Sequence, residues 1–354
     1  MGVKGNMSKI LKYSKVYKPF KFPFAEQIRQ KHEDAHWTLK AVKNLNEDAS
    51  DFKNKMSKGQ QEFVVNDLKM FTQSDVSVGR VYAECLIPLA KNNETRCMYM
   101  SFGAREALHQ EAYAALNDTL ALPATIYSEF LTDPALIQKN EMLTIELDPN
   151  LDDLTNLKQI SAKMVFLEGV SLFASFVMLM NFRRAEAGGL MSGMCSIVDW
   201  SVKDESIHVE GHLAVLNEIG RPDANMIKKF AKQVVEAEDG FIDYAFANYE
   251  IPGLTKEEVK LYIRFITDRR CIQLGIKGIY GVKENPIPWT DEVFTANKFG
   301  NFFERTITEY GKHSLTGEWL KDDEYFKFLK KPEDLSIEDL ISGVSSRVRG
   351  PIDK

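Results

Sequence analysis

Two Glu-x-x-His pairs are the residues of this chain best suited to do chemistry. They are Glu106 with His109 and Glu205 with His208. Residues three positions apart lie on one face of a helix, so each pair can direct a carboxylate and an imidazole at the same metal ion. A single pair of this kind more often belongs to a solvated helix face, so the interpretation depends on what accompanies the pairs.

A lone carboxylate precedes each pair by a similar distance. Asp75 lies 31 residues before Glu106, and Glu168 lies 37 residues before Glu205. Two helices that supply single carboxylates and two that supply Glu-x-x-His form the ligand set of ferritin-like di-metal proteins. Four carboxylates and two imidazoles suit two iron or manganese ions, whereas zinc more often recruits cysteine and calcium does not need histidine.

A third Glu-x-x-His pair, Glu33 with His36, has no lone acid on an earlier helix. We interpret it as part of a polar helix face. The sequence therefore predicts one di-metal site, built from the two pairs that have an upstream acid.

Nearly the whole chain has the periodicity of helices, so the predicted fold class is all-α. Strand-like alternation is scarce, and Gly and Pro fall between long periodic runs. The predicted architecture is a ferritin-like helical bundle with additional helices and the di-metal carboxylate site in its core. Trp37 would lie in the first of the predicted helices. These cover residues 24–44, 58–90, 93–120, 152–184, 190–218, 222–248 and 255–280, with shorter pieces at 123–132 and 134–140 and a loop at 282–300.

Composition restricts the possible partners and compartments. The chain has 354 residues, is 44% hydrophobic and carries a net charge of −6, which argues against nucleic acid as an electrostatic partner. Its four cysteines show no metal or redox spacing, which favours reduced thiols in a reducing compartment. The basic N-terminus has no apolar core and does not read as a secretory signal. We expect a cytoplasmic protein.

One apolar stretch, from Met164 to Phe182, is as long as a membrane span. It contains Glu168, and a carboxylate in lipid is costly. A helix that is apolar on every side and carries one acid is better placed at the centre of a large bundle, where a metal ion would compensate the buried charge. We therefore expect no membrane contact.

The residues around the two pairs resemble those of the small, radical-generating subunit of class I ribonucleotide reductase. HQEAY places Tyr113 four residues after the histidine of the first pair, and KDESIH places Asp204 directly before the second pair. An early AHW contains Trp37, and NFFERTITEY ends at Tyr310. The resemblance extends over residues 20–310, nearly the whole chain.

The resemblance implies a subunit of ribonucleoside-diphosphate reductase. In that family the di-metal site activates oxygen to form a tyrosyl radical, which passes to a large catalytic subunit for the reduction of ribonucleotides to deoxyribonucleotides. The implied cofactor is two iron ions in a di-iron-oxo centre, or alternatively two manganese ions or one ion of each. The implied metal ligands are Asp75, Glu106, His109, Glu168, Glu205 and His208.

The resemblance also assigns roles beyond the metal ligands. Tyr113 would hold the radical, and Trp37, Asp204 and Tyr310 would carry it outward. An apolar oxygen and radical pocket would be lined by Leu172, Phe173 and Phe176. Many relatives have an aromatic residue where this chain has Leu172.

The implied organisation is an N-terminal arm at 1–20, a di-metal domain at 21–305 and a flexible tail at 306–354 that docks on the large subunit. A homodimer is also implied. The tail ends in SSRVRGPIDK, unlike the acidic and aromatic ending of many relatives.

Two other functions fit a di-metal helical bundle. One is a related ligand-binding oxidase that acts without a large subunit, and the other is a storage protein of the ferritin type. A stand-alone oxidase needs no path from the metals to the surface, so the relay of Trp37, Asp204 and Tyr310 favours the reductase subunit.

Overall fold

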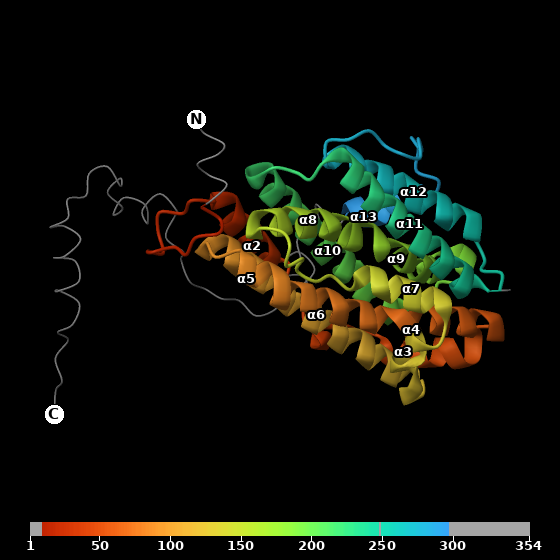
Figure 1. The fold of residues 1–354 in the computed structure, drawn as a ribbon. Coiled ribbons are helices and arrows are strands. Elements are labelled where there is room, and N and C mark those ends of the chain that lie inside the picture. The colour runs from red at the N-terminus through yellow and green to blue at the C-terminus, as the bar shows by residue number, and fades with distance from the viewer. Residues whose placement is uncertain (1–8, 248, 297–354) are drawn as a thin grey trace, which may run out of the picture. The chain divides into compact units, whose positions relative to one another are not determined.

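The helices that carry the two pairs and their lone acids lie together in the computed structural model, which describes residues 9–247 and 249–296 (Figure 1). Within those ranges there is no strand, only one isolated bridge between Ile251 and Leu254. The α-helices are α2 (Pro23–Asp34), α3 (Leu45–Ser50), α4 (Lys58–Val81), α5 (Ile87–Leu89), α6 (Asn93–Thr119), α7 (Pro134–Leu143), α8 (Asp153–Phe166), α9 (Phe173–Met180), α10 (Ser192–Ile219), α11 (Ala224–Phe246), α12 (Lys256–Gln273) and α13 (Trp289–Ala296). Tyr310 and the predicted tail at 306–354 lie outside the described residues.

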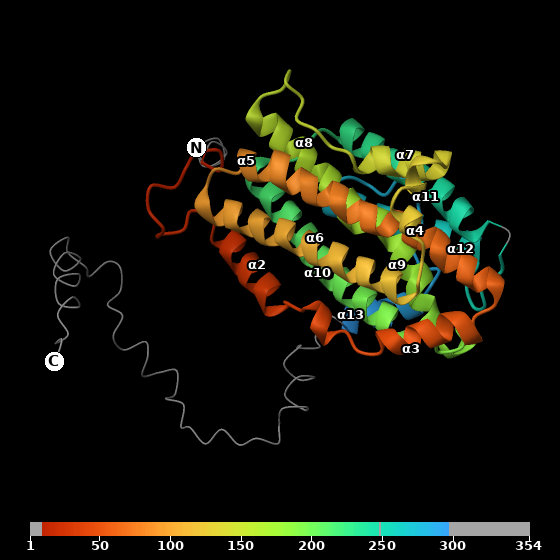
Figure 2. The same ribbon diagram turned by 90° about the horizontal axis from the view of Figure 1, so that it is seen from below.

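The repeated pattern of a lone acid followed by a pair corresponds to two packed sets of helices. Helix α4 carries Asp75 and packs against α6, which carries the first pair. The helical run from α8 to α9 carries Glu168 and packs against α10, which carries the second pair. Figure 2 shows α4, α6 and α10 as long neighbouring helices in the centre of the bundle. The all-α prediction is confirmed.

The apolar stretch considered as a membrane span is a core helix. One continuous helical run covers Asp153–Arg183, and its most hydrophobic window is completely buried inside the protein. This agrees with the prediction that the acid within the stretch, Glu168, lies at the centre of a bundle. Within that window no residue is left for a lipid to contact.

Glu168 lies where that run departs from α-helical geometry. Leu167–Ser171 form a π-helical segment, η6, between α8 and α9. A π-helical turn leaves carbonyl groups without their usual partners, and such turns are frequent at functional sites. Two cations take these carbonyls: the half-buried Arg270 donates from Nε to Gly169 O at 3.1 Å, and the buried Lys139 donates from Nζ to Ser171 O at 2.8 Å. The backbone around Glu168 is thus fixed by side chains from α12 and α7.

The start of α10 is fixed from a short helix that the sequence pattern did not predict, α3. Asp48 on α3 accepts the backbone N–H groups of Gly193 at 3.0 Å and Met194 at 2.6 Å. These are among the N–H groups that a helix start leaves without a partner. A carboxylate is a favourable acceptor there because the N-terminal end of a helix dipole is positive. This contact sets the position of the helix that carries Glu205 and His208.

Two predicted helix ends are wrong, and one predicted loop contains a helix. Helix α2 ends at Asp34, not at residue 44, so Trp37 lies in the segment that follows the helix. Arg105 stabilises this end of the helix, because it donates to His32 O at 3.2 Å and to Ala35 O at 3.4 Å and so satisfies carbonyls there. The helix predicted to reach residue 280 stops at Gln273.

Gly275 explains that earlier stop. Its φ of 82° lies in the left-handed region, where glycine readily ends a helix. The third difference is α13, which forms inside the predicted loop at 282–300 directly after Pro288. A proline before a helix is compatible with helix initiation, although we interpreted it as a loop signal.

Candidate metal centre

The six residues predicted as metal ligands meet at one point in the core. All six are buried, with exposed fractions of 1% or less. They supply atoms to two overlapping groups, each with its potential ligand atoms within 4.8 Å of one another. Glu106 belongs to both groups, so the arrangement offers two adjacent ion sites that share a carboxylate. One group is Glu106, Glu168, Glu205 and His208, and the other is Asp75, Glu106 and His109.

Both imidazoles turn the same ring nitrogen towards the carboxylates. His208 Nδ1 lies 3.2 Å from Glu168 Oε1 and 3.3 Å from Glu205 Oε2. His109 Nδ1 lies 3.4 Å from Glu205 Oε1 and 3.7 Å from Glu106 Oε2. The contacts are close enough for ion pairing, but these nitrogens form no aligned hydrogen bond. Each Nδ1 therefore faces the space between the carboxylates.

Unpaired polar atoms collect in that space. Burying polar atoms without partners is costly, and native proteins rarely do so without a compensating group. Cations bound among these atoms would satisfy them together, and a set of carboxylate oxygens and imidazole nitrogens without sulfur suits iron or manganese. The buried atoms without a hydrogen-bond partner in the described residues include Asp75 Oδ2, both Oε atoms of Glu106 and of Glu205, Glu168 Oε2, and Nδ1 of His109 and of His208.

The charges within the cluster also favour the binding of cations. Burial, followed by the nearby Glu205 carboxylate, raises the pKa of Glu106 to about 7. Burial likewise raises the pKa of Asp75 well above its usual range. Burial would do the same to Glu168, but the imidazoles of His208 and His212 lower the pKa of that carboxyl to about 2. Repulsion between buried carboxylates is what bound cations would relieve.

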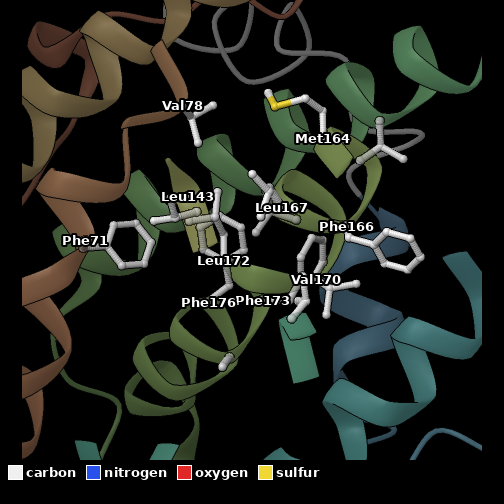
Figure 3. Packing of buried hydrophobic residues seen from close by; sticks show 14 of the residues in the cluster. Phe71, Val78, Leu143, Met164, Phe166, Leu167, Val170, Leu172, Phe173 and Phe176 are labelled. Atoms are coloured by element: carbon white, nitrogen blue, oxygen red, sulfur yellow. The ribbon is translucent and has the colours of Figure 1, made fainter. Parts of the chain in front are cut away.

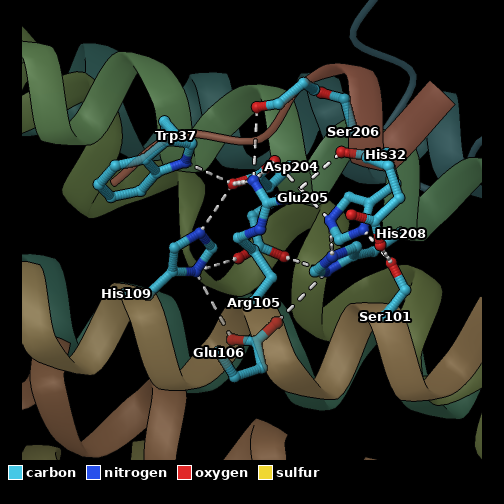
Figure 4. A network of polar contacts seen from close by, with 12 residues as sticks. His32, Trp37, Ser101, Arg105, Glu106, His109, Asp204, Glu205, Ser206 and His208 are labelled. Carbon is cyan, nitrogen blue, oxygen red and sulfur yellow. Dashed lines mark hydrogen bonds and ion pairs between the residues drawn. The ribbon is translucent and has the colours of Figure 1, made fainter. Parts of the chain in front are cut away.

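His109 is oriented from behind by a charged partner (Figure 4). Its Nε2 lies 3.1 Å from Asp204 Oδ2, which also accepts a hydrogen bond of 2.8 Å from Trp37 Nε1. Arg105 donates to Asp204 Oδ1 at 3.1 Å. Burial would raise the pKa of Asp204, but the hydrogen bond from His109 and the Arg105 charge lower it to about 2. Ionised Asp204 therefore favours a proton on His109 Nε2 and a free lone pair on Nδ1.

These contacts join the predicted relay residue Trp37 to the cluster. The Trp37 ring also stacks beside the His109 ring, with centroids 5.9 Å apart and an interplanar angle of 20°. Trp37, Asp204 and His109 thus form one buried chain of contacts that ends at the candidate metal centre.

His208 is oriented by a neutral partner that sequence reasoning did not find, His32. The two Nε2 atoms lie 3.2 Å apart, and His32 Nδ1 lies 2.6 Å from Ser101 Oγ. Burial and the neighbouring His208 lower the pKa of His32 to about 2, so its ring is neutral. A proton on His32 Nδ1 can bond Ser101, which leaves His32 Nε2 to accept from His208 Nε2. His32 belongs to no repeated spacing, so the sequence offered no signal for it.

Tyr113, the predicted radical residue, is completely buried on α6. Its hydroxyl donates to Ser201 Oγ at 3.2 Å. Burial, followed by the Asp75 carboxylate, raises the pKa of Tyr113 well above its usual range, so the phenol is neutral. Its ring packs against Phe71 with centroids 4.2 Å apart.

The three residues predicted to line the pocket lie in the apolar core around the turn between η6 and α9 (Figure 3). Phe176 packs between Phe71 and Phe173, at centroid distances of 5.6 Å and 5.4 Å. Leu172 is 2% exposed. Because Phe71 also contacts Tyr113, an apolar wall continues from the tyrosine to the π-helical segment.

Two further residues that the sequence analysis missed contact Glu168 directly. Tyr82 donates its hydroxyl proton to Glu168 Oε1 at 2.5 Å, and His212 Nε2 lies 3.1 Å from Glu168 Oε2. His212 follows His208 by four residues, a spacing that puts both on one helix face and could have been noticed. Tyr82 had no comparable signal, because it meets Glu168 across 86 residues of sequence.

A helical bundle whose core brings together two Glu-x-x-His pairs and two lone acids defines a ferritin-like carboxylate protein with a candidate di-metal site. A family model described as "Ribonucleotide reductase, small chain" matches residues 14–286. The probable ribonucleoside-diphosphate reductase small subunit 048L of Invertebrate iridescent virus 3 is 38% identical over 330 residues, which cover 86% of each chain. This chain therefore belongs to the ribonucleotide reductase small-chain family, and the predicted enzyme class is confirmed.

Solved structures support the fold. The ribonucleotide reductase Rnr4 homodimer of Saccharomyces cerevisiae matches with a TM-score of 0.67 at 18% identity, over 88% of this chain and 95% of that one. The dimanganese(II)-NrdF of Streptococcus sanguinis matches with a TM-score of 0.64 at 16% identity, over 80% of this chain and 99% of that one. At these identities the likeness extends to the fold alone.

Proposed function

We propose that this chain generates and stores the radical of a ribonucleoside-diphosphate reductase, using two metal ions. The ions would lie between Asp75, Glu106, His109, Glu168, Glu205 and His208. The convergence of unpaired, buried oxygen and nitrogen atoms from these residues carries the proposal. In the absence of cations, that cluster would hold several carboxylates in a low-dielectric core at a large energetic cost.

Tyr113 is the residue that we propose to hold the radical. The metals would supply oxygen activation and a one-electron oxidant, and the phenol would lose an electron and its hydroxyl proton. The neutral state of Tyr113 means that the proton is still present to be lost. The apolar wall of Phe71, Phe176 and Phe173 would keep water and reductants away from the oxidised ring.

Trp37 and Asp204 are proposed to carry the radical between the metals and the partner subunit. The supporting geometry is the buried chain of contacts from Trp37 through Asp204 to His109. Tyr310 is proposed as the next member of the relay, although it lies outside the described residues.

Two iron ions are the proposed cofactor, with two manganese ions or a mixed pair as alternatives. The same oxygen and nitrogen ligands suit both metals, so metal availability and activation chemistry decide between them. The similar fold of a dimanganese(II) protein from Streptococcus sanguinis makes manganese a concrete alternative.

A large catalytic subunit is the partner that family membership implies, and residues 306–354 are proposed as the tail that docks on it. We also propose residues 1–20 as an arm, residues 21–305 as the di-metal domain and a homodimer as the assembly. The homodimeric Rnr4 structure, which has the same fold, supports the last point. A cytoplasmic location is proposed because all four cysteines are free thiols.

The ligand-binding oxidase remains the alternative to test, although the contacts of Trp37 and Asp204 favour the reductase subunit. The metal-loaded protein should restore reduction of nucleoside diphosphates when it is mixed with the large subunit. Trp37→Phe should abolish this reduction while leaving oxygen consumption during metal loading unchanged. Oxygen consumption with no nucleotide reduction in the unmodified protein would favour the oxidase.

A further inference from the structure

Tyr82 holds one oxygen of Glu168 from outside the cluster and is itself contacted by His212. The Tyr82 hydroxyl donates to Glu168 Oε1 at 2.5 Å, and His212 Nε2 lies 3.0 Å from the Tyr82 hydroxyl oxygen. With the proton on His212 Nε2, the imidazole can donate to Tyr82 while Tyr82 donates to Glu168. The three side chains then form a directed chain of hydrogen bonds that ends at a carboxylate of the cluster.

The backbone places Tyr82 and Glu168 on unusual turns. Tyr82 is the first residue of a π-helical segment, η3 (Tyr82–Leu86), and Glu168 lies in the π-helical segment η6. A π-helical turn contains more residues than an α-helical turn and so changes the direction in which side chains project. Both segments, η3 and η6, therefore depart from regular helix at the position where Tyr82 reaches Glu168.

The supporting imidazole is itself held in place. The His212 ring stacks on Tyr82 at a centroid distance of 5.8 Å and on Tyr99 at 5.5 Å, with interplanar angles of 23° and 29°. Tyr82, Tyr99 and His212 are all completely buried. This packing restricts His212 to an orientation in which Nε2 faces both Tyr82 and Glu168.

Tyr82 and Tyr113 are both buried but have different hydrogen-bond partners. The Tyr113 hydroxyl bonds a serine, Ser201, whereas the Tyr82 hydroxyl bonds Glu168, one of the candidate ligands. Tyr113 is the proposed radical residue, and nothing in that role uses Tyr82. The contact of Tyr82 with Glu168 therefore needs an explanation of its own.

We propose that Tyr82, supported by His212, is a positioning residue that fixes the Glu168 carboxylate towards the ion it would share with Glu205 and His208. This role rests on the proposed di-metal function. A carboxylate that is already oriented loses less conformational freedom when it binds an ion, and outer partners of metal ligands typically change metal affinity by about 10–100-fold. Among the described residues, Asp75 and His109 form no hydrogen bond or ion pair with Tyr82 or His212, so an ion that these two residues would hold should be affected much less.

Manganese(II) titration of the metal-free full-length protein tests the proposal, with electron paramagnetic resonance used to count free and bound ions. Tyr82→Phe removes only the hydroxyl and should weaken one of two binding steps by about 10–100-fold. Tyr99→Phe is the matched control, because its hydroxyl faces Ser161 at 3.5 Å and not Glu168, while its ring stacks on the same imidazole. That variant should bind both ions as the unmodified protein does.

His212→Gln gives a second, independent variant. It should weaken the same binding step in the same direction. Its effect should not add fully to that of Tyr82→Phe, because His212 contacts both the Tyr82 hydroxyl and the Glu168 carboxylate that this hydroxyl holds. Thermal unfolding of the metal-free variants reports whether each is folded before the titration.

The outcomes separate this role from the proposed function. Two tight ions in the unmodified protein and in both tyrosine variants would overturn the positioning role and leave the di-metal function intact. Failure of the unmodified protein to bind two ions would overturn both. Equal weakening of both binding steps by Tyr82→Phe would also overturn the proposal, since it would indicate a general loss of structure.

Discussion

Asp204→Asn removes a negative charge from a buried acceptor that several side chains share beside the candidate metal centre. Asp204 contacts Arg105 at 3.1 Å, His109 at 3.1 Å and Trp37 at 2.8 Å. Asparagine has nearly the same shape and can still accept a hydrogen bond from Trp37 through its carbonyl oxygen. The substitution therefore tests the charge and leaves the packing almost unchanged.

The expected cost follows from the burial of Arg105, whose side chain is only 4% exposed. Removing one member of a buried ion pair typically costs about 3–5 kcal/mol, because the remaining charge stays in a medium of low dielectric constant. That is a large part of the roughly 5–15 kcal/mol by which a protein domain is stable. His109 would also lose its carboxylate acceptor, which should lower the affinity for an ion bound at His109 by about 10–100-fold.

Urea unfolding of the metal-free protein, followed by circular dichroism, measures the effect on the free energy of unfolding separately from the effect on metal binding. We expect Asp204→Asn to lower the free energy of unfolding by about 3–5 kcal/mol. Combining it with Arg105→Gln removes both charges, so the double variant should lose about 2–3 kcal/mol less than the sum of the single losses. Additive losses, or a loss below about 1 kcal/mol for Asp204→Asn, would refute the idea that this charge pair stabilises the centre.

Three further outcomes are expected. Tyr113→Phe removes one hydroxyl, so it should cost only about 1 kcal/mol in thermal unfolding yet abolish the tyrosyl signal in electron paramagnetic resonance; a persisting signal would assign the radical to another residue. Trp37→Phe and Tyr310→Phe should keep the signal but stop nucleotide reduction, and loss of the resting signal in the Tyr310 variant would contradict its relay role. Burial raises the pKa of Asp67 to about 7 despite a hydrogen bond from Ser175. A raised carboxyl pKa gives stability below about pH 4 that is lost as the pH rises towards 7. Asp67→Asn should therefore be more stable than the unmodified protein at pH 8 but not at pH 4. Urea unfolding that gives the same difference in stability at both pH values would contradict this.

The positions of the predicted ligands could be inferred from sequence because the signal is local. Glu106 and His109 share a helix face by their spacing alone, and the same holds for Glu205 and His208. The structure brings these residues together with both lone acids, and their binding of metal remains a prediction.

The outer partners could not be inferred because their contacts are distant in sequence. His32 meets His208 across 176 residues, and Tyr82 meets Glu168 across 86. No spacing rule relates such residues before the helices are packed. The end of α2 could not be inferred for the same reason, since Arg105 on another helix donates to the carbonyls there.

The π-helical segments could not be predicted from the sequence pattern either. The apolar run through Glu168 reads as one continuous helix, and its periodicity gives no sign of the change at Leu167–Ser171. The side chains that compensate for this turn, Lys139 and Arg270, come from helices before and after it in the chain. Their role follows only from the packed structure.

The most direct test of the account is a crystal structure of the metal-loaded protein with anomalous diffraction at the iron and manganese edges. The account predicts two ions about 3.5–4 Å apart, the usual spacing of a two-metal site. Nδ1 of His109 and of His208 should each bind one ion, and Glu106 should contact both. A single ion, or either imidazole turned away from the metals, would contradict the central claim.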